Sequence, residues 1–175
     1  ATNVFYKNIS YFTICSFSCS EELISLYNSF DDQVIKDLRL NAFFEDNGDE
    51  QYRVSKVGEK VYDCFAIRSV ELYLNKAEAE AMLDKVEAIQ TIKTLLHNRF
   101  EGGIPDVDGL SGKDLVSFIR DERRRELCFE AHRWFDLRRY AVSPKYPEKK
   151  SIRHTAYDIK GKLEGDYVLK PYGED

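Results

Sequence analysis

The sequence predicts a mainly α-helical protein, an α-α superhelix with minor irregular β-structure. Apolar residues recur at spacings of three and four through residues 67–99, and a charged motif at 120–140 continues a further helical stripe. With 175 residues, of which 43% are hydrophobic and 13% aromatic, the chain can bury one sizeable core. We therefore expect a single domain over residues 1–175, with an irregular or β segment at 36–66, a helical core at 67–140 and a tail at 141–175.

Composition excludes several functional classes. The formal net charge is −5, from 26 basic and 31 acidic residues, so the chain lacks the broad positive field of a nucleic-acid-binding protein and we expect no nucleic-acid partner. No apolar run approaches the roughly 20 residues that span a bilayer. The four cysteines and three histidines are scattered rather than paired at zinc-site spacing, so we expect no metal and no cofactor.

The first predicted helix lies near residues 20–29. Ser20 is placed as its N-cap, and Glu21 and Glu22 fall in the first turn, where the helix dipole favours acids. Residues 36–66 then contain the turn-forming segment EDNGDE and short extended stretches, which predict minor β-structure.

The strongest periodicity predicts a helix near 67–83 and a second helix near 85–99, folded back as an antiparallel hairpin. Asp84 and Glu87 form a variant of the capping box at the start of the second helix. Close approach of the partner helix, as in a TPR-like repeat, is allowed by small residues at Ala77, Ala79 and Ala81. Because about three repeats are needed to bury a continuous core, we expect the neighbours to lie outside this chain and the alanine face to be exposed.

A third helix is expected near 111–129, starting from Ser111 with Asp114 at the capping-box position, and a short helix near 132–140. Two glutamates of the third helix lie on its apolar stripe and so point toward the core. Buried carboxylates need arginine partners, which grip them bidentately. The sequence therefore predicts a structural ion network of Glu122, Arg123, Arg124, Arg125 and Glu126.

Other roles for this motif are less favoured. Acids interleaved with the arginines would repel phosphate, which argues against nucleic acid. Glu122 and Glu126 could form an acid/base pair as in glycoside hydrolysis, and Cys128 and His132 share an i, i+4 spacing suited to a nucleophile and its base. Neither pair has a distinctive sequence context. Trp134 and Phe135 follow the helix, and we expect them to anchor the core rather than to form a ligand platform.

The segment ERRRELCFEAHRWFDLRRY, residues 122–140, resembles the signature near the C-terminus of SusD/RagB-type outer-membrane nutrient-binding lipoproteins. Two upstream segments, SEELISLYNSFDDQVIKDLRLNAFF and AIRSVELYLNKAEAEAML, resemble the region before that family's last helical repeat and the repeat helix itself, in the same order. The tail departs from the family pattern, because YVLKPYGED is not followed by a proline-rich segment. We therefore expect a C-terminal fragment or a truncated homologue.

This resemblance implies a non-catalytic, cell-surface subunit that binds glycans or other nutrients and works with a SusC-like TonB-dependent transporter of the outer membrane. Membrane attachment would come only from a lipid anchor on an N-terminal part outside this chain. The alternatives are a helical-repeat scaffold that binds proteins and a carboxylate-based glycoside hydrolase. Four aromatic residues are candidates for ligand binding: Phe43, Phe44, Tyr52 and Tyr62. Packing in the core is the competing interpretation for them.

Overall fold

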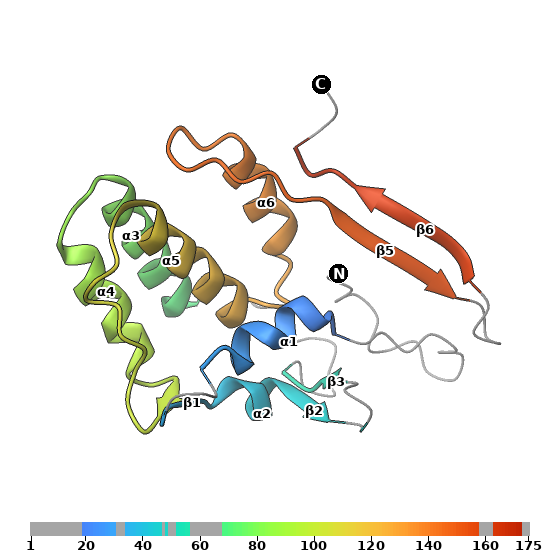
Figure 1. The fold of residues 1–175 in the computed structure, drawn as a ribbon, viewed down its shortest axis with the longest axis horizontal. Helices are drawn as coiled ribbons and strands as arrows, with labels where there is room; N and C mark the ends of the chain where they lie inside the picture. The colour runs from blue at the N-terminus through green and yellow to red at the C-terminus, as the bar shows by residue number, and fades with distance from the viewer. Residues whose placement is uncertain are drawn as a thin grey trace.

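The predicted fold class is confirmed: six helices and only small two-stranded sheets make up the described part of the chain. Figure 1 shows α3, α4 and α5 side by side, α6 next to them, and a long β-hairpin that projects away from the helices. The computed structural model of the protein describes residues 19–30, 34–46, 48, 52–56, 68–157 and 163–172.

Helix α1 spans Glu21–Asn28, as predicted. The Ser20 hydroxyl caps it by accepting a hydrogen bond from the Leu23 backbone N–H at 3.3 Å. The helix buries Leu23, Ile24 and Tyr27 on one side. The sequence-predicted cap and apolar face are thus both confirmed.

Short elements lie beneath α1 in Figure 1. In two antiparallel pairs, β1 joins β4 and β2 joins β3. The sequence did not predict α2, which begins where the Asp37 carboxylate accepts a hydrogen bond from the Arg39 backbone N–H at 2.9 Å and so favours a turn. The bounds of these elements are β1 Lys36–Asp37, α2 Arg39–Phe43, β2 Phe44–Asp46, β3 Tyr52–Val54 and β4 Phe100–Glu101.

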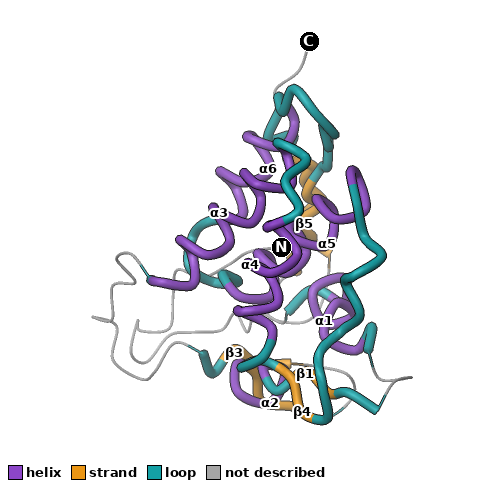
Figure 2. Tube along the Cα trace, turned by 90° about the vertical axis from the view of Figure 1, so that its left-hand side faces the viewer, coloured by secondary structure: helices purple, strands orange, loops and turns teal. Residues whose placement is uncertain are grey.

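The predicted helical hairpin is formed by α3 (Ser69–Met82) and α4 (Glu87–Leu96). Figure 2 shows both helices together with α5, which packs on α3. The expectation of an exposed alanine face is wrong. Ala77 and Ala81 are buried in the core that α3 shares with α4 and α5, and Ala79 points outward because it lies two residues out of phase.

Both predicted capping boxes are wrong, although the helix positions are right. The N-cap of α4 is Val86, which makes no side-chain cap. Asp84 instead follows the end of α3 with a φ of 56°, and its carboxylate accepts a hydrogen bond from Lys145 Nζ at 2.5 Å. At α5 (Gly112–Glu126), Ser111 has extended N-cap backbone geometry but its hydroxyl makes no cap hydrogen bond.

Helix α5 ends at Glu126, earlier than the predicted residue 129. Phe129 and Ala131 follow with φ values of 62° and 63°, a left-handed backbone that cannot continue the helix. The chain then forms α6 (Arg133–Ala141) and the antiparallel hairpin of β5 (Ile152–Tyr157) and β6 (Leu163–Leu169).

Two hydrophobic clusters stabilise the fold. The larger one is formed by α3, α4, α5 and the segment around Val107, and the smaller one lies between α1, Phe44 and the loop after α5. Helix α5 contributes to the larger cluster with Val116 and Ile119 and leads directly into Cys128 of the smaller one. Its last turns therefore lie where the two clusters meet, and this is where the charged motif is located.

Candidate functional site

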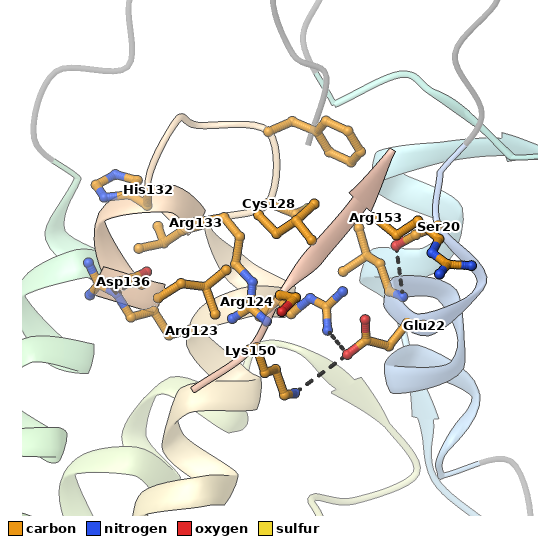
Figure 3. Close-up of a pocket in the computed structure, with 16 residues that line it drawn as sticks. Ser20, Glu22, Arg123, Arg124, Cys128, His132, Arg133, Asp136, Lys150 and Arg153 are labelled. Carbon is orange, nitrogen blue, oxygen red and sulfur yellow. Dashed lines mark hydrogen bonds and ion pairs between the residues drawn. The ribbon is translucent and has the colours of Figure 1, made fainter. Parts of the chain in front are cut away.

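A cavity of about 290 Å³ opens between α1, the end of α5, the start of α6 and the chain that leads into β5. Figure 3 shows polar side chains from all four segments around it. We call it the cationic cavity. It is lined by Ser20, Glu22, Leu23, Arg123, Arg124, Leu127, Cys128, Phe129, His132, Arg133, Asp136, Leu137, Lys150, Ser151, Ile152 and Arg153.

Local backbone geometry brings these segments together. The first turn of α1, fixed by its serine cap, supplies Glu22, and the last turn of α5 supplies Arg123 and Arg124. The two left-handed residues after α5 change the direction of the chain, so that α6 begins beside the end of α5 and supplies Arg133. Lys150 enters from the segment before β5.

Positive groups outnumber negative groups around the cavity. Five guanidinium or ammonium groups line it against two carboxylates, in a chain whose formal charge is −5. Glu22 accepts a hydrogen bond from Arg124 Nη1 at 2.8 Å, and Lys150 Nζ lies 3.5 Å from the same carboxylate. The hydrogen bond from Arg124 outweighs burial and lowers the pKa of Glu22 to about 2. Glu22 therefore remains a carboxylate at neutral pH.

The second carboxylate, Asp136, is also occupied. It accepts hydrogen bonds from Arg123 Nε at 2.9 Å and from Arg139 Nη2 at 3.2 Å. Arg133 differs from these neighbours: among the residues that the structure describes, no hydrogen bond or ion pair holds its guanidinium. Burial, and then the charge of Arg124, lower the pKa of Arg133.

The predicted buried glutamates lie away from the cavity. Glu122 is 0% exposed and accepts hydrogen bonds from Arg39 Nη1 at 2.5 Å and from Arg125 Nε at 2.9 Å. Burial alone would raise the pKa of Glu122, but the charges of Arg39 and Arg125 overcome this effect and lower it to about 2. Asp37 binds the other side of the Arg39 guanidinium at 2.7 Å. Glu122 is thus ionised, and it is the counter-ion of Arg125 and one of the counter-ions of Arg39.

Glu126 is 1% exposed and binds three arginines from distant parts of the chain. It accepts hydrogen bonds from Arg68 Nη2 at 2.6 Å, Arg99 Nε at 2.7 Å and Arg39 Nη1 at 3.2 Å. We call these residues the buried ion-pair network: Asp37, Arg39, Arg68, Arg99, Glu122, Arg125 and Glu126.

The structure divides the five predicted members of the ion network. Glu122, Arg125 and Glu126 belong to the buried ion-pair network, whereas Arg123 and Arg124 line the cationic cavity. Local spacing could indicate only the contact between Glu122 and the arginine three residues later. Glu126 binds three arginines that lie between 27 and 87 residues away in the sequence: Arg39 of α2, Arg68 at the α3 N-cap and Arg99 after α4. No local signal identifies them.

The two catalytic alternatives find no support in the geometry. Glu122 and Glu126 are buried and their pKa values are lowered, so neither meets substrate nor holds the proton that a general acid must donate. Burial raises the pKa of Cys128, whose Sγ lies 3.3 Å from the Tyr27 hydroxyl, whereas a reactive thiol needs a lowered pKa. His132 follows the end of α5, so the helical i, i+4 relation is lost.

The candidate ligand-binding aromatic residues are distributed as follows. Phe44 is 4% exposed and makes edge-to-face contacts with three other rings, at centroid distances of 5.5, 5.9 and 6.5 Å, so it is a core residue. Phe43 is half-buried with Lys56 Nζ 4.4 Å from its ring centroid, and Tyr52 is half-buried against the same cluster. Tyr62 lies outside the described residues. A sugar-binding role for Phe43 and Tyr52 stays a prediction.

The expectation that Trp134 and Phe135 anchor the core is wrong. Their side chains are 37% and 69% exposed. Helix α6 buries Asp136, Leu137 and Tyr140, which share one face at helical spacing, and the two aromatic residues lie out of phase with it. The phase of the leucine and tyrosine could have shown this from the sequence.

Within the described ranges, no group of three or more His, Cys, Asp or Glu side chains is arranged to hold a metal ion. No helix in this part of the chain is long and apolar enough to cross a membrane.

Comparison with known proteins identifies the family of this chain. Residues 39–168, from α2 to β6, match the model of the SusD family. The chain belongs to this family. It is also similar to SusD-like protein P38 of Formosa agariphila, with 40% identity over 77 residues, which covers 40% of this chain and 15% of that protein. The chain thus aligns with only a small part of this relative's length.

Proposed function

We propose that this chain is the C-terminal part of a non-catalytic protein that binds glycans or other nutrients for uptake. The observation that carries the proposal is the SusD-family match over residues 39–168. Proteins of this family are in general non-catalytic and bind nutrients. The burial of Glu122 and Glu126 supports the same interpretation, because it removes from solvent the carboxylate pair that a hydrolase would need.

The proposal includes a partner and a location. The partner is a SusC-like TonB-dependent transporter of the outer membrane, to which the complete protein delivers its ligand at the cell surface. Attachment to the membrane comes from a lipid anchor on an N-terminal part outside this chain. We assign no nucleic-acid partner, in agreement with the formal charge of −5.

Features of this chain suit a carbohydrate partner. Trp134 and Phe135 expose aromatic surface, and aromatic rings present apolar faces against which a sugar ring can pack. The cationic cavity adds the few convergent polar groups that fix a small ligand in place.

The test is glycan-array binding by the full-length protein, followed by incubation with each bound polysaccharide and measurement of released reducing ends. We expect binding of at least one glycan and no release. Turnover would contradict a pure binding protein, and absence of all glycan binding would favour the scaffold. Co-purification with a SusC-like TonB-dependent transporter from detergent-solubilised membranes tests the partner, and separate elution of the two proteins would contradict it.

A further inference from the structure

The cationic cavity has an imbalance of charge that its own residues do not neutralise. Its lining has five cationic side chains and two acids, although partners beyond the lining also engage three of the cations: Glu71 pairs with Arg123 at 3.6 Å, Glu148 pairs with Lys150 at 3.3 Å, and Arg153 makes a further interaction. A concave site lined by charge of one sign concentrates counter-ions. The excess is local, because the whole chain is acidic. The cavity therefore favours an anion over a neutral or positive ligand.

Both carboxylates of the cavity are already engaged. Glu22 is shared between Arg124 at 2.8 Å and Lys150 at 3.5 Å, and Lys150 also pairs with Glu148 at 3.3 Å. Asp136 is bound by Arg123 and also by an arginine outside the cavity. Neither acid has a hydrogen bond or ion pair with Arg133.

Among the residues that the structure describes, Arg133 has no counter-ion within ion-pair distance. It is half-buried at the first position of α6 and lines the cavity, where Figure 3 places it near Arg124 and Arg123. Glu22 and Glu148 attract it only from beyond ion-pair distance. A guanidinium has five N–H donors and is costly to remove from water without acceptors. An anion in the cavity would supply those acceptors.

We infer that the cationic cavity binds a single anionic group of an acidic glycan, a uronate carboxylate or a sulfate ester, with Arg133 as the principal ligand and Arg124 and Lys150 as supporting ligands. Guanidinium groups bind both oxyanions through paired hydrogen bonds. The volume of about 290 Å³ suits one charged sugar residue rather than a chain segment. The inference rests on the proposed function and specifies its substrate class.

The test uses three probes on the full chain: glucuronate, inorganic sulfate and neutral glucose, titrated by calorimetry at constant ionic strength in chloride buffer. We expect glucuronate or sulfate to bind and glucose not to bind at this site. Arg133→Gln should weaken anion binding at least about tenfold, the loss expected for one charge-assisted hydrogen bond. The matched control is Arg138→Gln, an exposed arginine of the same helix that lines a separate groove and should retain wild-type affinity.

Thermal melting midpoints of the wild type and the variants show whether a loss of binding comes from misfolding. Because Arg133 has no ion pair among the described residues, Arg133→Gln should melt at or above the wild-type midpoint in chloride buffer. Stronger binding of glucuronate than of sulfate identifies a uronate ligand, and the reverse order identifies a sulfated one. Absence of anion binding by the wild-type chain, or equal binding by Arg133→Gln, would overturn the inference. Array binding of neutral glycans with unaltered affinity in Arg133→Gln would overturn it while leaving the proposed function intact.

Discussion

Replacement of Glu122 by alanine tests whether the buried ion-pair network stabilises the fold. The substitution removes the carboxylate that binds both Arg39 and Arg125. Arg39 keeps Asp37 and Glu126 as partners. Among the described residues, the buried Arg125 side chain keeps only a 3.3 Å hydrogen bond to a backbone carbonyl of α1 and contacts with aromatic rings. The cost therefore falls mainly on Arg125.

The expected magnitude is that of an uncompensated buried charge, about 3–5 kcal/mol. For a chain of this length each kcal/mol lowers the melting midpoint by about 2–4 °C, so the expected decrease is about 6–20 °C. Glu126→Ala should cost less than Glu122→Ala. Two of the arginines that bind Glu126, Arg68 and Arg99, are partly exposed and can regain water when their carboxylate is removed.

Urea unfolding followed by circular dichroism measures both variants, with Glu101→Ala as an exposed control expected to change stability by less than about 0.5 kcal/mol. The double variant Glu122→Ala/Arg125→Leu should recover part of the loss, because it removes the stranded charge as well. A Glu122→Ala chain as stable as the wild type would refute the stabilising role of the network. The motif would then need a different explanation.

Remaining predictions concern pH and three further sites. The pKa of the Glu122 carboxyl is about 2 in the folded protein and 4.5 in the unfolded chain, so the stabilisation that this carboxylate provides is complete above pH 4.5 and is lost as the pH falls toward 2. The urea midpoints of wild type and Glu122→Gln should therefore converge over that window, and a constant gap between them would contradict the prediction. Tyr27→Phe removes a 2.7 Å hydrogen bond to a buried carbonyl of α5 and should cost about 1–3 kcal/mol in urea unfolding, whereas an unchanged midpoint would refute this contact. Phe44→Ala should cost about 3–5 kcal/mol and Phe135→Ala less than about 0.5 kcal/mol, and the reverse order would show that the burial is assigned wrongly. Because burial raises the pKa of Cys128, its thiol should react with a disulfide reagent only on unfolding, in a variant whose other cysteines are serine; rapid native labelling would argue against burial.

Local pattern was sufficient wherever neighbouring residues decide the outcome. Ser20 was identified as an N-cap because its hydroxyl needs only the backbone three residues away. The burial of Glu122 and Glu126 followed from their place on an apolar stripe, since residues at helical spacing share one face. Local rules failed at Asp84, where the backbone adopts a left-handed geometry instead of an N-cap, and at Ser111, where the N-cap backbone forms but the hydroxyl makes no cap hydrogen bond.

By itself, the sequence determined every described helix except α2, the order of these helices, and the need of two buried glutamates for arginine partners. Only the tertiary structure decided which arginines those are, because Arg39 and Arg99 reach Glu126 across 87 and 27 residues of chain. It also separated the arginines of α5, turning Arg125 toward the core and Arg124 toward a cavity. Helical spacing fixes which side chains share a face, but the return path of distant segments decides whether that face meets a counter-ion, a core or an open site.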